Sequence, residues 1–157
     1  MSMVRVEVEI EDRKAVEFIE VEGGSFETVL RKVCALAALE NLNVFERGSE
    51  EPIGVEIEMR KVLSLHGHRC RKVLVKVHWN HLTKEHNFSP AVHIHRVLLW
   101  AISKEGFNLD DTAKAKSNLI LPGTGEPLPK DAVIGRFVKH GDCALTLELT
   151  LKDFTNG

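Results

Sequence analysis

The alternation of hydrophobic and polar residues predicts two strands at the beginning of the chain. Residues 4–10 read Val-Arg-Val-Glu-Val-Glu-Ile, with a period of two, and residues 15–21 form a second such segment after a polar turn. A period of two places the hydrophobic side chains on one face of a strand. The two segments are therefore expected to form a hairpin with one buried face.

A helical pattern follows this hairpin. Ser25 is a suitable N-cap, and the helix is expected to extend over residues 25–40. Its hydrophobic side chains recur at helical spacing and would pack on the hairpin: Phe26, Val29, Leu30, Val33, Leu36 and Ala37. Residues 42–45, 55–59 and 61–65 then supply shorter strands.

The second half of the chain repeats this order of elements. Residues 72–79 and 84–88 are expected to form a hairpin. Ser89 as N-cap and Pro90 at the first helical position predict a helix over residues 91–105. Its hydrophobic stripe consists of Ile94, Val97, Leu98, Ala101 and Ile102. The polar residues that follow are read as a weakly patterned connection.

The last part of the chain returns to strand patterns. A short apolar strand at residues 119–121 leads into a turn rich in proline and glycine, and residues 132–138 form a compact segment. The final strand alternates strictly, with four leucines on one face: Leu145, Leu147, Leu149 and Leu151. A polar tail, residues 153–157, follows this strand.

The repeated order of hairpin, helix and shorter strands predicts an α+β chain of two tandem β-grasp domains, and this order resembles that of ubiquitin, which implies ubiquitin-like domains with a free C-terminal tail. The expected domains are residues 1–68 and 71–152, and the resemblance implies that residues 153–157 are the conjugation tail. The junction between Gly67 and Arg71 is very short, so the two domains should lie close together.

Composition excludes several classes of function. The 157 residues are 43% hydrophobic and 28% charged, which favours a folded core over disorder. The formal net charge of −2 gives no reason to expect nucleic acid or an anionic membrane as a partner. No apolar run approaches the roughly 20 residues of a membrane span. We expect a cytoplasmic protein, in which Cys34 and Cys143 are reduced core residues.

No catalytic centre, metal site or cofactor is expected. His66, His68 and Cys70 carry zinc-ligand chemistry, but no ordered second ligand pair accompanies them. Histidines on the surface or between the domains are the simpler interpretation. Gly123 and Gly125 form a turn and not a phosphate loop, since no Gly-Lys-Ser/Thr follows. No nucleophile and base occur at a supportive spacing, so the chain is not expected to be an enzyme.

The strings VKVHWN, NFSP, WAI and GTGEPLP give the second half its resemblance to bacterial ubiquitin-like proteins. The two-domain arrangement also resembles the interferon-stimulated tandem ubiquitin-like modifier of vertebrates. This resemblance implies partners: an E1-like activating enzyme, an E2-like conjugating enzyme, a JAB-type metalloprotease and a protein target, such as a phage protein. It implies ATP-dependent conjugation in bacterial antiphage defence.

The resemblance assigns the conjugation site to Gly157, with a tail presented to the partner enzymes: Asp153, Phe154, Thr155 and Asn156. The chain departs from ubiquitin in ending Asn-Gly instead of Gly-Gly. Ile120 corresponds to an exposed isoleucine of ubiquitin and is a candidate partner-binding residue, whereas the last strand is polar near Glu148. The alternative hypothesis is a non-covalent tandem β-grasp adaptor or scaffold with an inert tail.

Overall fold

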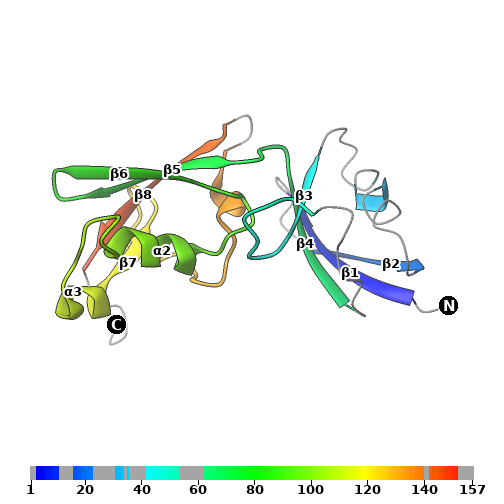
Figure 1. Cartoon of the computed structure of the whole chain (residues 1–157), viewed down its shortest axis with the longest axis horizontal. Helices are drawn as coiled ribbons and strands as arrows, with labels where there is room; N and C mark the ends of the chain where they lie inside the picture. Colours follow the sequence, from blue (N-terminus) through cyan, green and yellow to red (C-terminus); the bar gives the residue numbers. More distant parts are fainter. Residues whose placement is uncertain are drawn as a thin grey trace.

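The computed structural model describes residues 3–10, 16–22, 31–33, 35, 42–53, 62–139 and 142–151, which form two units (Figure 1). The strands of the first unit are β1 (Met3–Ile10), β2 (Glu17–Glu22), β3 (Asn43–Glu46) and β4 (Val62–His68). They form one sheet in the order β2-β1-β4-β3. β1 pairs antiparallel with β2 and parallel with β4, and β3 pairs antiparallel with β4.

The first unit also contains helical residues where the sequence predicts a helix. Residues 31–33 and 35 are helical, and Val33 is fully buried in the hydrophobic cluster of the first sheet. The rest of the predicted helix, including Ser25 and Cys34, lies outside the described residues, as does the strand predicted at residues 55–59.

The second unit repeats the topology of the first. Its elements are β5 (Val73–Trp79), β6 (Leu82–Phe88), α2 (Ile94–Ile102), α3 (Asp111–Lys116), β7 (Asn118–Ile120), the 3₁₀ helix η1 (Ile134–Phe137) and β8 (Ala144–Thr150). The sheet order is β6-β5-β8-β7. β5 and β8 pair parallel at its centre, with antiparallel strands on both sides.

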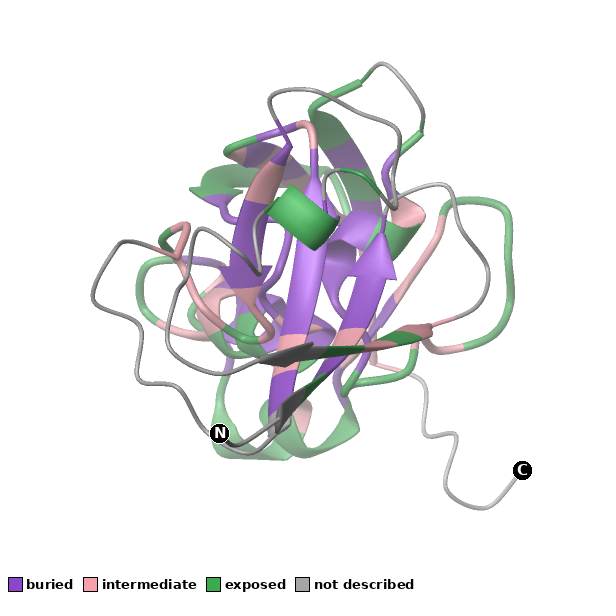
Figure 2. Ribbon diagram, turned by 90° about the vertical axis from the view of Figure 1, so that its right-hand side faces the viewer, coloured by how far each residue is buried: buried purple, intermediate pink, exposed green. Residues whose placement is uncertain are grey.

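The period-two patterns place the core of the second unit between its sheet and α2. The buried residues alternate along β5 and β8. In Figure 2 the first unit faces the viewer, and purple marks the buried residues of its sheet. Five buried residues of α2 complete this core: Ile94, Val97, Leu98, Ala101 and Ile102. The predicted helical stripe and the buried face of the last strand are confirmed.

The predicted start of α2 is wrong by three residues. The helix begins at Ile94, because the preceding backbone groups bond to other segments. The Ala91 carbonyl accepts from Gly48 N at 2.8 Å, and the Val92 carbonyl accepts from Ile134 N at 2.9 Å. Ser89 is no helix cap, since its Oγ accepts from Ala91 N and donates to a carbonyl of the first unit. The helix ends at Ile102, three residues before the predicted end.

Two further local features differ from the sequence prediction. The second hairpin turns in two residues, Asn80 and His81, with Asn80 at a φ of 56°, so β6 begins earlier than predicted. The connection after α2 contains α3, whose N-cap Asp110 accepts a hydrogen bond from Ala113 N at 2.8 Å. This short helix has no buried residues, so hydrophobic periodicity did not reveal it.

Each sheet has a first and a last strand paired parallel at the centre and antiparallel strands outside, with helical residues on one face. This is the β-grasp arrangement, and the predicted α+β fold of two tandem ubiquitin-like β-grasp domains is confirmed. β4 ends at His68 and β5 begins at Val73. The exact domain limits stay a prediction.

Candidate functional site

The strand that precedes the tail is firmly held in the second domain. β8 lies between β5 and β7, and three of its leucines are buried: Leu145, Leu147 and Leu149. Leu151 follows the strand and packs half-buried against the same core. The predicted conjugation residue and tail lie outside the described residues: Asp153, Phe154, Thr155, Asn156 and Gly157.

The candidate partner residue Ile120 lies on the outer face of the second sheet. It is half-buried on β7 and pairs directly with Glu148 of β8. Glu148 in turn pairs with His78, whose Nδ1 lies 2.7 Å from Thr83 Oγ1 on β6. Ile120 is therefore an apolar residue at the edge of a polar row, and a partner would contact charged groups beside it.

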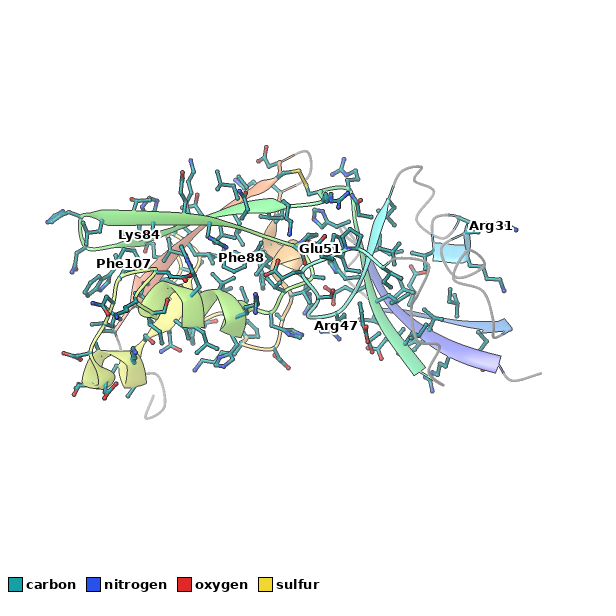
Figure 3. All side chains as sticks on the ribbon, viewed as in Figure 1. Arg31, Arg47, Glu51, Lys84, Phe88 and Phe107 are labelled. Carbon is teal, nitrogen blue, oxygen red and sulfur yellow. A yellow bond between two sulfur atoms is a disulfide. The ribbon has the colours of Figure 1, made fainter. Side chains whose placement is uncertain are left out.

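Glu50 connects the two domains. Its Oε1 lies 2.8 Å from Nε of Arg96 on α2, and its Oε2 accepts a hydrogen bond from Ser89 N at 3.0 Å. Its backbone carbonyl accepts from Lys72 Nζ at 3.2 Å. Glu51 (labelled in Figure 3) lies beside it, with Oε1 3.8 Å from the same lysine nitrogen. The loop after β3 thus binds the segment that leads into α2.

A group of polar side chains around the buried Glu9 lies at the same junction. His66 is fully buried, and its Nδ1 is 3.5 Å from Oε1 of Glu9, which is also within 3.7 Å of Nε of Arg136 on η1. His68 is fully buried as well. Both histidines are therefore buried and not surface residues, and for His66 the interdomain interpretation holds, because its Nε2 lies against Gly135 of the second domain.

The environment of Glu9 changes its pKa. Burial by itself would raise the pKa, because it disfavours the charged carboxylate. The neighbouring His66 and the charges of Arg136 and Arg47 outweigh burial and lower the pKa of Glu9 below its usual value of 4.5. A lowered pKa means that the ionised form stabilises the folded state above pH 4.5, and that this contribution is lost as pH falls through the lower folded value.

The Glu9→Gln substitution is therefore expected to make the stability of the protein less dependent on pH in the acidic range. The wild-type melting temperature should fall more steeply than that of Glu9→Gln between about pH 6 and about pH 3, because only the wild type loses this carboxylate on protonation. The exposed Glu126→Gln variant serves as the control and should follow the wild type. An equal fall of the melting temperature with decreasing pH in wild type and Glu9→Gln would contradict the lowered pKa of Glu9.

Cys70 and Cys143 form a disulfide across a sequence separation of 73 residues. The expectation that Cys143 is a reduced core residue is therefore wrong, and Cys143 is exposed. The bond also removes Cys70 as a thiolate for the zinc ligands weighed with His66 and His68. A sequence signal existed: the two cysteines precede β5 and β8, which a β-grasp sheet pairs parallel, so both lie at the same end of the sheet.

The described part of the chain was also compared with the requirements of a metal site and of a membrane span. No group of three or more His, Cys, Asp or Glu residues among these ranges has an arrangement suited to a metal ion. Within the same ranges, no helix is both long and apolar enough to cross a membrane.

The comparison with protein families agrees with the geometry of the second domain. A family model described as BilA ubiquitin-like domain 2 matches residues 74–152, which is half of the chain. The chain belongs to the BilA ubiquitin-like family. The match extends from β5 through β8 and includes Ile120. A search of curated proteins gives no match. The bacterial ubiquitin-like resemblance of the second domain is thus confirmed.

Proposed function

We propose that this BilA-family protein is a protein modifier, joined to target proteins through the carboxylate of Gly157. The observation that carries the proposal is the family match over residues 74–152, the domain from which the tail would extend. The buried leucines of β8 support it, because they fix the root of the tail while other proteins act on its end. The chain itself is a substrate of enzymes and performs no catalysis.

The proposed chemistry uses nucleophiles of partner proteins. In an E1-like enzyme, a Gly157 carboxylate oxygen attacks the α-phosphorus of ATP, which gives an acyl-adenylate and releases pyrophosphate. A cysteine thiolate of that enzyme then displaces AMP and forms a thioester. A cysteine of the E2-like enzyme accepts the acyl group by thioester exchange. A lysine amine of the target finally displaces this thiol and forms an isopeptide bond.

The tail has the dimensions for this role. An extended Asp153–Gly157 segment would span roughly 17 Å at about 3.3 Å per residue, enough to enter a narrow active-site channel. Glycine at the end has no Cβ and permits backbone conformations that other residues resist. A JAB-type metalloprotease would process or remove the modifier, and the bacterial family suggests a phage protein as a target in antiphage defence. The two-domain form resembles the vertebrate interferon-stimulated modifier.

Reconstitution tests the proposal. The chain is incubated with ATP and the E1-like and E2-like proteins of its own pathway, and mass spectrometry searches for a bond between Gly157 and a thiol or a lysine. Deletion of Gly157 should abolish this adduct. The melting temperature should stay unchanged, because the tail adds little to either core. Binding of ATP by the E1-like enzyme without the chain verifies that this enzyme is functional. Exchange of pyrophosphate with ATP requires adenylation of the chain, so it should occur with the full-length chain and be lost with the deletion.

The alternative is a non-covalent adaptor with an inert tail. It predicts that active enzymes form no adduct with the full chain, as they form none with the Gly157 deletion. An adduct that persists after the deletion would show conjugation through another carboxylate and would contradict the role of Gly157.

A further inference from the structure

β6 is an edge strand with an open side. Among the described residues it pairs with β5 alone and lies last in the sheet order, and six of its seven residues are exposed. In a hairpin with a two-residue turn, the residues flanking the turn exchange hydrogen bonds, and bonded and non-bonded pairs then alternate. The pair Trp79–Leu82 flanks this turn, so the backbone groups of Thr83, Glu85 and Asn87 point away from β5.

A hollow adjoins this edge on the helix side of the sheet. It has a volume of about 460 Å³ and lies between β6 and α2. Its apolar lining includes Phe88 of β6 with Leu99 and Trp100 of α2. His86 covers the same lining, and its ring centroid lies 4.8 Å from that of Phe88 and 5.5 Å from that of Trp100. Leu99 of α2 is 51% exposed although it is an aliphatic residue.

The charges beside the hollow are mainly positive. Lys104 lines it, and Lys84 lies two residues from His86 on the same side of β6, toward the hairpin end (Figure 3). Both lysines are exposed, and neither forms an ion pair with another described residue. Arg96 already pairs with Glu50, and Glu105 is the acidic group at the hollow. An anionic side chain placed here would have free lysines to meet.

We propose that the open edge of β6 and this hollow bind an extended peptide segment of a partner protein, which adds a fifth strand to the sheet. The backbone of the segment pairs with Thr83, Glu85 and Asn87. An apolar side chain of the segment enters the hollow over Leu99 and Trp100, and an acidic side chain faces Lys104, which lines the hollow. Strand addition of this kind obtains affinity from backbone hydrogen bonds and specificity from alternate side-chain pockets.

Charge disfavours the central registers of a second copy of the chain at this edge. Two β6 strands related by a two-fold axis through the sheet would place one residue opposite its own copy. With the axis at Lys84 or at Glu85, like charges lie directly across from each other, which destabilises strand pairing. A helical partner would fill the hollow but leave the outward backbone groups of β6 without partners. An extended segment with an acidic residue satisfies both features.

Selection from a random dodecapeptide library, with the full chain as the bait, tests this proposal. We expect the selected peptides to share apolar residues in alternation and an acidic residue, and to bind equally well when Gly157 is deleted. Because no ATP or enzyme is present, failure of the conjugation reaction leaves this result unaffected. Enrichment of peptides whose apolar residues recur at a helical period would overturn the proposal. So would a selection in which every enriched peptide binds the Leu99→Asp variant as well as it binds the wild-type chain.

Variants locate the binding. Glu85→Pro removes an outward N–H without removing a hydrogen bond to β5, so the affinity for the selected peptides should fall at least tenfold. Glu85→Thr keeps this N–H and should bind the peptides as the wild type does. Lys104→Glu should weaken them about fivefold, and a lysine in place of the acidic peptide residue should restore affinity. Amide spectra check that each variant is folded, and Lys104→Glu provides the test if Glu85→Pro is not.

Equal affinity of the peptides for Glu85→Pro and Glu85→Thr, or no effect of Lys104→Glu, would contradict the proposed mode. Sedimentation of the free chain supplies the remaining check. A dimer that Glu85→Pro dissociates and Glu85→Thr preserves would identify the occupant as a second copy and overturn the proposal.

Discussion

Replacement of Leu147 by Ala is expected to lower the free energy of unfolding by about 2–5 kcal/mol. Leu147 is fully buried at the centre of β8, opposite Val77 of the adjacent parallel strand. The substitution removes buried methyl and methylene groups and leaves a cavity in the core of the second domain. Chemical denaturation monitored by the fluorescence of Trp79 and Trp100 measures the change, since both indoles pack against this core.

Thr146→Ala is the matched control for this prediction. Thr146 precedes Leu147 on the same strand but is exposed on the opposite face, so its truncation should change stability by no more than about 0.5–1 kcal/mol. A similar loss from both substitutions would show that β8 does not bury one face and would contradict the account of how the tail is anchored.

Gly135→Ala should weaken the junction between the domains. A Cβ at Gly135 would meet Nε2 of His66 at 2.4 Å and the Pro90 carbonyl oxygen at 2.9 Å, both closer than stable contacts allow. The backbone here is already held, because Gly135 N donates to that carbonyl at 2.8 Å. We expect a loss of about 1–3 kcal/mol, as for other overpacked sites, together with faster hydrogen exchange at Gly48 N and Ser89 N.

Gly125→Ala separates this steric effect from the general effect of replacing glycine. A Cβ at Gly125 meets no atom within 4 Å, so the variant should keep the stability and the exchange rates of the wild type. Unchanged protection of the junction amides in Gly135→Ala would mean that η1 moves away without cost, and that the two domains do not depend on this contact.

Regular alternation made much of the fold predictable. β5 and β8 each bury one face, so a period of two appears directly in their sequences, and the repeated order of elements then identified two β-grasp domains. The start of α2 was not predictable in this way. Ser89 and Pro90 form a strong local helix signal, but hydrogen bonds from Gly48 and Ile134 compete for the backbone that follows them.

The contacts between the domains were also beyond the reach of a local pattern. Glu50 is one charged residue in an irregular loop, and its partners Ser89 and Arg96 are about 40 residues or more away in the sequence. Glu9 occupies a polar position of the alternation in β1 and pairs with His66 of β4. Both are contacted by η1 of the second domain, which lies far away in the sequence, so their burial was not predictable from the pattern. The assignment of Gly157 came from family resemblance and stays a prediction.

The central place of β8 has a consequence for synthesis on the ribosome. The hairpin of β5 and β6 forms from local contacts, but the second sheet cannot close until β8 has emerged and inserted beside β5, some 70 residues upstream. A nascent chain that stops before β8 therefore lacks a finished second domain. Completion of the second sheet therefore waits for β8, so chains that stop before this strand should be recognised as incomplete and degraded.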